Sequence, residues 1–563
     1  MSRGGRGPDT GWRPAVEERL TASSFRGRLD PRHLAVALAV VAGLLVLAIA
    51  HEVFPYHSIN HDEGVYLQQA AMLLEGKLVL EPPVAESFRP WFFVSDAGGG
   101  FYPKYEPVPA AMFAVGGLLG WYRLALGLIA AGTVLAAYAT VAEAFDRRVG
   151  VTAAALLVAS PLFLVQAAVF LPYVPTLFLE VTFAWAFLRA DRTGSHRLAA
   201  LAGVAIGLAF FARPYTAVLF ATPFVALALW RLREFERAVL RRQLLTAGPG
   251  LVFVALALGY NAILTGEVFT FPYQAFAPED GLGFGHRELL GHETVYTVSL
   301  AVRAGLANLR IFLTDWVVAA PLGGVLALVG IALAIHRRST VLDGRTLAIG
   351  ALFVTVPVGE LYFWGTLNVL GDLEMAGDGL VAALGPYYHL DLLVPTVAFG
   401  GLAIVRSGEW AWPRVAGLDG SGRRTVAAVG LLVMAGAGGA MVVGAVDEPL
   451  AANGEVTAIY EDAYEPVESR EFDDALVYLP EPYGPWLNHP FQHLRNDPGY
   501  DGTVVYALDN APFPVADAFP DRTLYRYAYR GTWAPPAGEA VTPQLRRVER
   551  VRGDAVTLSV TAG

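Results

Sequence analysis

Long apolar runs separated by short, arginine-containing segments occupy most of the chain. The first run, residues 34–50, has 17 residues without a charge, which is close to the ~20 that a helix needs to cross about 30 Å of hydrocarbon. Similar runs recur as far as residue 446. This pattern predicts an all-α, polytopic bundle of membrane-spanning helices rather than a soluble enzyme.

The arginine clusters predict the orientation of the bundle, because cytoplasmic loops carry an excess of positive charge. With every cluster inside, the chain has about 11 spans, its N-terminus in the cytoplasm and its C-terminus outside. The apolar run 108–121 is too short for a span and suits an interfacial or re-entrant helix, since counting it would move Arg147 and Arg148 outside. The expected spans are residues 33–50, 122–143, 150–171, 173–190, 197–213, 214–231, 244–263, 314–335, 346–366, 387–405 and 424–446.

This topology divides the chain into three parts. Residues 1–32 form an arginine-rich cytoplasmic tail, residues 33–446 form the transmembrane domain with outer loops 51–121 and 264–313, and residues 447–563 form an extracytoplasmic domain. Residues 48–50 read Ala-Ile-Ala, which resembles a signal-peptidase site. The lead-in before the first run is far longer than the basic region of a signal peptide, so we expect a retained signal anchor in the cell membrane.

The last part of the chain has a different composition. From residue 447 onward there are 19 Asp and Glu against 9 Arg, which accounts for the net charge of -10. The runs 475–479 and 503–507 are rich in β-branched and aromatic residues and predict strands. We therefore expect a small, folded α/β or mainly β domain.

The overall composition excludes several kinds of site. There is no cysteine, so disulfides, thiolate catalysis and cysteine-based metal sites are excluded. Lysine occurs only at Lys77 and Lys104. No region is basic enough to bind nucleic acid, whereas the bilayer itself is an expected partner.

The strongest candidate for chemistry is the acidic pair Asp62 and Glu63, which follows the first apolar run by about a dozen residues. Carboxylates placed just outside a bilayer are candidates for a general base at the membrane surface. The alternative is that both acids stabilise the start of a helix near Gly64, because negative charge is favourable at a helix N-terminus. The two roles are compatible.

Three short stretches resemble glycosyltransferases of the GT-C class, which take sugars from polyprenyl-phosphate carriers. They are HDEGVY at residues 61–66, YPKYEP at residues 102–107, and the segment 260–273 with its Tyr-Asn, Thr-Gly-Glu and Phe-Pro-Tyr groups. Weaker matches lie at residues 212–214 and 385–388. The resemblance extends over about residues 30–410, and it is strongest to the branch of protein O-mannosyltransferases and lipid A aminoarabinose transferases.

This resemblance implies roles for particular residues. Asp62 would be the general base that deprotonates the acceptor, and Glu63 would support the site. Lys104 lies where the family has a basic residue that meets the carrier phosphate. The usual pattern there is Lys-Pro-Pro, whereas this chain has Lys-Tyr-Glu-Pro at residues 104–107.

Further candidates are arginines for the donor phosphate and polar residues for the substrate pocket. Ionisable residues within spans usually pair with one another or line a cavity, and lipid-headgroup anchoring or salt bridging between helices are the alternatives. The phosphate candidates are Arg213, Arg303 and Arg310, and the pocket candidates are His61, Tyr66, Tyr102, Glu106 and Glu360. The other ionisable residues within expected spans are Glu180, His389 and Asp391.

No metal ligand is assigned, and a divalent cation stays an open alternative. His61, Asp62, Glu63, His286 and His292 would have to converge for such a site, and the sequence alone does not place them together.

The resemblance implies an inverting enzyme that moves one sugar from a polyprenyl-phosphate donor to an acceptor on the outer face, the acceptor being a protein glycan, a lipid or a surface polysaccharide. The Trp-Trp-Asp motif of oligosaccharyltransferases is missing, which argues against transfer of a whole glycan to asparagine. A transporter or flippase for a lipid-linked or polar solute is the main rival, although no internal repeat is evident. An envelope-assembly protein anchored by its bundle is a third alternative.

Overall fold

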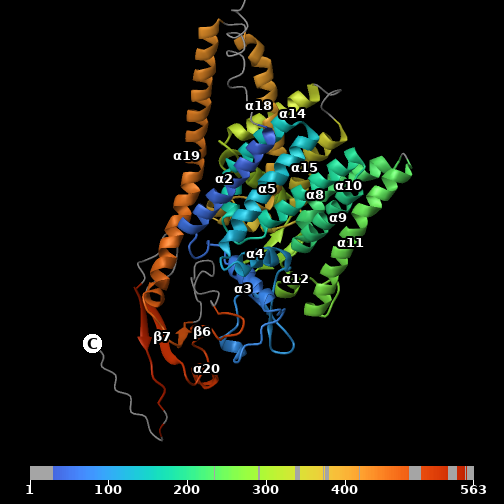
Figure 1. Ribbon diagram of the computed structural model, residues 1–563. Coiled ribbons are helices and arrows are strands. Elements are labelled where there is room, and N and C mark those ends of the chain that lie inside the picture. Colours follow the sequence, from blue (N-terminus) through green and yellow to red (C-terminus); the bar gives the residue numbers. More distant parts are fainter. Residues whose placement is uncertain are drawn as a thin grey trace, which may run out of the picture.

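The computed structural model describes residues 30–233, 235–289, 292–336, 343–371, 373, 379–416, 419–480, 496–530, 542–551 and 553. A bundle of helices forms most of the molecule, and a small domain with a sheet lies beyond one end of it (Figure 1). The expected cytoplasmic tail lies outside the described residues except for residues 30–32. The mostly helical architecture with a small C-terminal sheet is the predicted one.

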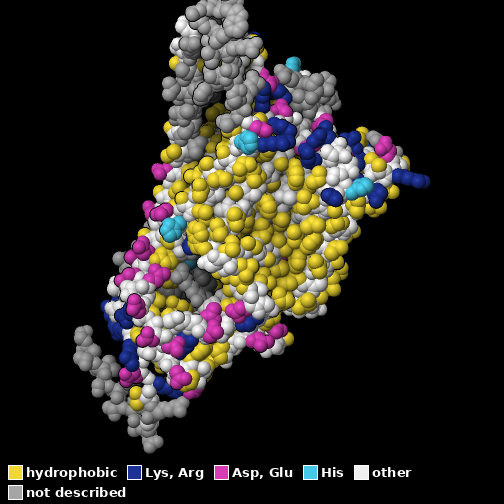
Figure 2. All heavy atoms as spheres, in the orientation of Figure 1, with side chains coloured by type: hydrophobic (Ala, Val, Ile, Leu, Met, Phe, Trp, Pro, Cys, Tyr) yellow, Lys and Arg dark blue, Asp and Glu magenta, His cyan; other side chains and the backbone are white. Residues whose placement is uncertain are grey.

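The bundle consists of helices joined by short turns and by three longer connections, residues 53–122, 266–321 and 361–392. Its helices are α2 (Pro31–Glu52), α5 (Arg123–Ala144), α6 (Arg147–Val158), α7 (Pro161–Ala167), α8 (Tyr173–Thr193), α9 (His196–Ala212), α10 (Pro214–Leu232), α11 (Arg237–Thr265), α14 (Leu322–His336), α15 (Gly344–Glu360) and α18 (Leu393–Ala416). Figure 2 shows a broad hydrophobic surface over these helices, with basic side chains gathered at one end and acidic side chains at the other.

Five helical stretches among the described residues are long and apolar enough to cross a membrane, and a sixth is counted if the bent pair α6 and α7 is one span. Each expected span overlaps a helix of the structure, and the spans 173–190 and 424–446 overlap α8 (Tyr173–Thr193) and α19 (Gly420–Glu468), which are not among these stretches. The number of crossings and their orientation stay predictions.

The expected span 150–171 is not one straight helix. The helices α6 and α7 meet at a bend of 65°, and Pro161 is the first residue of α7. Proline has no amide hydrogen to continue the helical bonding, and it disfavours helical backbone at the residue before it. Ser160 accordingly has ψ of 122°, which is extended backbone.

The first outer loop contains the helices α3 (Asp62–Leu74), η1 (Ala85–Ser87) and α4 (Val108–Leu118) and the antiparallel strands β1 (Phe93–Ser95) and β2 (Phe101–Pro103). At 11 residues, α4 is too short to cross a bilayer. The second outer loop contains α12 (Pro272–Phe276), the hairpin of β3 (Gly285–Leu289) and β4 (His292–Tyr296), α13 (Val298–Ile311) and η2 (Phe312–Trp316). The short helices α16 (Gly365–Asn368), α17 (Leu380–Leu384) and η3 (Tyr387–Leu392) precede α18.

One long helix, α19 (Gly420–Glu468), connects the bundle to the C-terminal domain. At 1.5 Å per residue, its 49 residues extend over about 74 Å, and the expected domain boundary at residue 447 falls inside it. The domain then forms a four-stranded sheet in the order β6-β5-β7-β8. Its elements are β5 (Ala475–Leu479), β6 (Val504–Leu508), α20 (Pro512–Ala518), β7 (Thr523–Arg530) and β8 (Thr542–Arg547).

The central strand β5 pairs in parallel with both β6 and β7, and all five of its residues are buried. Parallel strands connected by a helix are buried on both faces and therefore read as continuous apolar runs. The predicted strand at 475–479 coincides with β5, and the one at 503–507 lies within one residue of β6.

Close packing of the bundle depends on small residues where helices cross. An added Cβ at Gly330 of α14 would lie 1.9 Å from the carbonyl oxygen of Phe399 in α18. In the same way, a Cβ at Gly203 of α9 would lie 2.2 Å from the carbonyl oxygen of Thr246 in α11. Small residues let the backbones of membrane helices approach each other.

Replacing Gly330 with Ala should therefore force α14 and α18 apart and lower the free energy of unfolding by about 1–3 kcal/mol. Thermal unfolding of the purified protein in detergent measures this as a lower melting temperature. Gly259→Ala in α11 is the matched control, because its added methyl group meets nothing within 4 Å. Equal melting temperatures for the two variants would contradict the close crossing.

Candidate active site

Asp62 is the first residue of α3, and both of its carboxylate oxygens are engaged. Lys104 Nζ lies 2.9 Å from Oδ1, and the hydroxyl of Tyr105 donates to Oδ2 at 2.7 Å. The side chain remains 21% exposed. His61, not Asp62, occupies the N-cap position and makes no side-chain capping bond, whereas Asn60 Oδ1 accepts the backbone N–H of Asp62 at 3.1 Å. Asp62 is thus an accessible carboxylate aimed at a cation.

Lys104 follows β2 directly and is almost completely enclosed, with only 5% of its side chain exposed. Its ammonium group lies against four aromatic rings at distances of 4.0–5.4 Å from Nζ to the ring centroids. These rings, which we call the aromatic box, belong to Phe92, Tyr105, Tyr273 and Phe276. Ring faces attract cations, so the box and Asp62 together hold the charge of Lys104 in place.

Glu63 points in another direction and is 1% exposed. It accepts the backbone N–H of Ser58 at 2.6 Å and that of Phe170 at 2.8 Å. Burial raises the pKa of Glu63, and the hydrogen bonds from Ser58 and Phe170 oppose that rise. Glu63 therefore ties the start of α3 to the segment between α7 and α8, which is a supporting position.

A second buried carboxylate, Asp280, supports the aromatic box from the second outer loop. It accepts hydrogen bonds from the hydroxyl of Tyr273 and from the indole N–H of Trp364. The ring of Tyr273 is stacked on that of Tyr105, with centroids 5.7 Å apart. Burial raises the pKa of Asp280, although these two hydrogen bonds and Lys104 act in the opposite direction.

Glu106, two residues after Lys104, is 8% exposed. Burial raises its pKa to about 7, against the lowering effect of its own backbone N–H and of Arg213. Arg213 is thus close enough to influence it. A carboxyl group with such a pKa exchanges its proton near neutral pH.

Arg213 lies at the junction between α9 and α10 and lines a small pocket with Tyr173, Thr216, Tyr388 and other residues of η3. Its guanidinium group lies 4.3 Å from the ring centroid of Tyr173 and 5.7 Å from that of Tyr388, and its Nε donates to Thr216 at 3.2 Å. Among the described residues, no carboxylate lies within ion-pair distance of it. The charge is therefore positioned by aromatic rings, and Asp391 lines the same pocket.

Tyrosine side chains connect the Asp62 region to the Arg213 pocket. Tyr66, Tyr173 and Tyr387 each lie within electrostatic range of both Asp62 and Arg213. The ring of Tyr66 is stacked on that of Tyr105 at 4.8 Å. The predicted base and one predicted phosphate ligand therefore belong to the same region.

The remaining pocket candidates are all buried. Glu360 is 3% exposed and lies within electrostatic range of Arg213. The ring of His61 lies 5.4 Å from that of His57, and Tyr102 packs in a cluster with Tyr260. Glu360 is thus close to the pocket, whereas His61 and Tyr102 pack in the walls of the outer loop.

Arg303 and Arg310 are not brought into this region by any described contact. Both lie on the exposed side of α13, and neither side chain forms a hydrogen bond or ion pair with the described residues around Asp62. Of the predicted phosphate ligands, the described contacts connect only Lys104 and Arg213 to the site.

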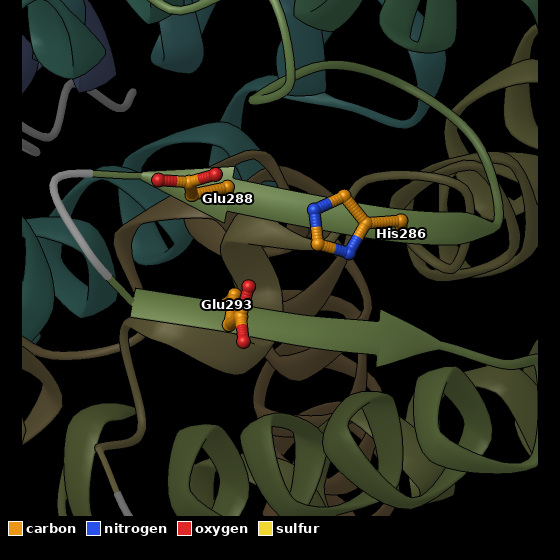
Figure 3. Close-up of side chains that lie close together, drawn as sticks. All are labelled: His286, Glu288 and Glu293. Atoms are coloured by element: carbon orange, nitrogen blue, oxygen red, sulfur yellow. The ribbon is translucent and has the colours of Figure 1, made fainter.

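The candidate metal ligands do not converge on Asp62 either. Among the described residues, one group of potential ligands is found on the β3–β4 hairpin, where His286, Glu288 and Glu293 lie side by side (Figure 3). Their ligand atoms lie within 4.8 Å of one another, and all three residues are exposed. His61, Asp62, Glu63 and His292 are not part of this group.

Several residues of the site were not singled out from the sequence. Tyr173, Asp280 and Trp364 were missed, because their roles arise from contacts between distant segments. Tyr105, Tyr273 and Tyr388 lie in the stretches that carry the family resemblance, but no role was predicted for them. The available signal was the density of aromatic residues in both outer loops, which is unusual for solvated loops.

The buried Glu106 should make stability depend on pH. Between pH 4.5 and about 7 the native protein retains a proton that the unfolded chain has released, so stability falls as pH rises through this interval. Relative to the wild type, Glu106→Gln should therefore gain up to about 3 kcal/mol between pH 4.5 and pH 8. Melting temperatures measured across this range test the difference, with the exposed Glu81→Gln as control; parallel curves for Glu106→Gln and wild type would contradict it.

Comparisons with known proteins match two parts of the chain. Residues 109–260 match the family described as dolichyl-phosphate-mannose-protein mannosyltransferase, and residues 475–563 match a domain of unknown function, DUF7846. No curated protein sequence matches the chain. The first matched range includes Arg213 but begins after Asp62 and Lys104.

Two solved structures are similar over most of the chain. One is the oligosaccharyltransferase AglB from Archaeoglobus fulgidus, in complex with an inhibitory peptide and a dolichol-phosphate. The TM-score is 0.46 and the sequence identity 12%, and the match covers 88% of this chain and 69% of the AglB chain. The other is ArnT from Cupriavidus metallidurans, bound to undecaprenyl phosphate. The TM-score is 0.47 and the sequence identity 14%, and the match covers 87% of this chain and 92% of the ArnT chain. The expected resemblance to the mannosyltransferase branch is confirmed by the family match over residues 109–260.

Proposed function

We propose that the protein is an inverting membrane glycosyltransferase that moves a single sugar from a polyprenyl-phosphate donor to an acceptor hydroxyl on the outer face of the membrane. The observation that carries this proposal is the accessible Asp62 carboxylate paired with the buried Lys104 at 2.9 Å. A base and a phosphate-binding cation lie side by side at the end of an apolar bundle. The family match over residues 109–260 supports the same reaction class.

The reaction needs a proton acceptor and a partner for the leaving group. The acceptor oxygen forms a bond to the anomeric carbon while the bond from that carbon to the phosphate oxygen breaks. Asp62 takes the hydroxyl proton, and the carrier leaves as polyprenyl phosphate. A single base in one direct displacement inverts the configuration at the anomeric carbon.

Lys104 and Arg213 are the groups that would stabilise the negative charge on the phosphate. Lys104 is desolvated by the aromatic box, and Arg213 lacks an ion pair among the described side chains. Fixed cations in a site shielded from water stabilise developing charge more strongly than they do in water. In the donor-free protein, Asp62 serves as the counter-charge of Lys104, and a donor phosphate would compete for it.

The proposed donor is lipid-linked, so its tail lies in the bilayer and its phosphate at the outer membrane surface. The hydrophobic band in Figure 2 ends close to the loops that carry Asp62 and Lys104. The acceptor is a hydroxyl-bearing protein glycan, lipid or surface polysaccharide, presented from the extracytoplasmic side.

Asp62→Asn keeps the size of the side chain and removes the base, so the transfer rate should fall by about 10²–10⁴. Mass spectrometry compares surface glycans and polyprenyl-linked lipids from cells that carry the wild-type protein or the variant. The variant should show loss of one sugar from the glycans and accumulation of the polyprenyl phosphate that carries this sugar. Glu81→Gln, exposed on the same loop, should leave both unchanged. Full glycosylation by Asp62→Asn would remove Asp62 from the mechanism, and unchanged glycans in cells without the protein would favour transport.

Lys104→Met removes the enclosed cation and should weaken binding of a short-chain prenyl phosphate by at least about tenfold, because hydrogen bonds to charged groups contribute about 1.5–3 kcal/mol. Isothermal titration calorimetry of the detergent-solubilised protein measures the affinity. Lys77→Arg is the control, since it changes the other lysine of the chain and keeps a donor for the carbonyl oxygen of Pro498. Equal affinities for the two variants would exclude Lys104 from phosphate binding.

A further inference from the structure

The C-terminal domain holds the first outer loop on both sides of α3. We propose that this domain, together with the outer end of α19, acts as a clamp that positions the aromatic box over Lys104. Its key contact is Phe88, which makes Phe88 and Phe92 positioning residues. The clamp rests on the proposed function in one respect, because it assigns a role in that function to the domain beside the site. The contacts that form the clamp do not depend on which reaction the protein catalyses.

The segment before α3 is fixed by the outer end of α19. The hydroxyl of Tyr56 donates to Glu468 at 2.9 Å. The ring of His57 lies 4.2 Å from that of Tyr460, and Thr457 donates to the carbonyl oxygen of Val53. Residues 58–61, which connect this segment to Asp62, therefore start from a position that α19 fixes.

The segment after α3 is fixed by the sheet domain. Lys77 Nζ donates to the carbonyl oxygen of Pro498 at 2.9 Å. The hydroxyl of Ser87 donates to the side-chain oxygen of Asn510 at 2.6 Å, and the amide of Asn510 donates to the carbonyl oxygen of Glu86 at 3.0 Å. These contacts join residues more than 400 positions apart in the chain.

Phe88 is the centre of this second attachment. It is 1% exposed and belongs to the hydrophobic core of the C-terminal domain, in a cluster with Leu476, Tyr478, Val505 and others. Its ring meets that of Tyr500 edge-on at 5.1 Å. A loop residue that completes the core of another domain is an anchor, because removing it leaves a cavity in that core.

Phe92 lies four residues after Phe88, in the turn that the attachment of Phe88 restrains. Its backbone has a φ of 62°, a left-handed conformation that is strained for a bulky residue. Strained residues persist only where the surrounding structure holds them, and they cluster at functional sites. The ring of Phe92 is the nearest of the four to Lys104, at 4.0 Å from Nζ.

A chain of contacts therefore leads from the C-terminal domain to the candidate base. Phe88 is fixed in the domain core, which restrains the strained turn at Phe92. Phe92 covers Lys104, and Lys104 pairs with Asp62. If the anchor is lost, the turn at Phe92 relaxes, and the ammonium group of Lys104 becomes accessible to solvent.

The test uses the accessibility of Lys104, which requires neither donor nor acceptor. Because the chain has only two lysines, Lys77→Arg leaves Lys104 as the sole side-chain amine and keeps a donor for Pro498. In this background the full-length protein is labelled with an amine-reactive reagent, and the labelling rate of the Lys104 peptide is followed by mass spectrometry. Phe88→Ala should raise the rate at least about tenfold, because labelling follows the population of locally opened states.

Two further variants make the test specific. Phe92→Ala should raise the labelling rate as Phe88→Ala does, and Phe88→Leu, which keeps an apolar anchor, should give an intermediate rate even if Phe88→Ala fails to fold. Phe472→Ala is the matched control: Phe472 packs on Tyr525 in a different cluster of the domain and should leave the rate unchanged.

The outcomes separate the clamp from general destabilisation and from the proposed reaction. An unchanged rate in folded Phe88→Ala or Phe88→Leu would overturn the clamp. An equal rise in Phe472→Ala would show that any damage to the domain exposes Lys104, which would also overturn the anchor role of Phe88. If the protein proves not to transfer sugars, the expected labelling rates stay the same, because the experiment uses neither donor nor acceptor.

Discussion

The ion pair between Asp62 and Lys104 is the interaction on which the site depends. An ammonium group with 5% of its side chain exposed would cost several kcal/mol without a counter-charge. Asp62 supplies that charge, and the aromatic box adds the attraction of four ring faces. In the proposed reaction, a donor phosphate would replace one anion beside Lys104 with another. The pair thus holds an enclosed cation next to a carboxylate that stays 21% exposed.

The segments around this pair are loops and short helices, whose own bonding does not fix them. Their rigidity comes from three outside attachments. Glu63 accepts the backbone N–H of Phe170 at the end of the bundle, Asp280 links Tyr273 of the second outer loop to Trp364 after α15, and Phe88 is embedded in the C-terminal domain. A catalytic geometry needs this kind of supporting shell, because small displacements of reacting groups reduce the rate strongly.

Much of this arrangement follows from local sequence, and the rest does not. The apolar runs predicted the helices, and the strand-like run at 475–479 predicted β5, because periodicity and composition act over a few residues. Asp62 and Lys104 were found as candidates through short motifs. The Tyr105 hydroxyl, the strained Phe92 and the attachment of Phe88 depend on segments up to about 420 residues apart. Pro161 is visible in the sequence, but the apolar composition around it predicts a single span over residues 150–171. The bend at this proline is seen only in the structure.

The two adjacent carboxylates show how a helix separates two roles. Consecutive residues of an α-helix point about 100° apart, so Asp62 and Glu63 at the start of α3 face different surroundings. Asp62 meets a cation, a phenol and solvent, while Glu63 is buried against two backbone N–H groups. Environment, not chemical type, assigns such groups their functions. Because Glu63 ties the first turn of α3 to Phe170, between α7 and α8, the position of Asp62 depends on the bundle as well as on the loop that carries its partners Lys104 and Tyr105.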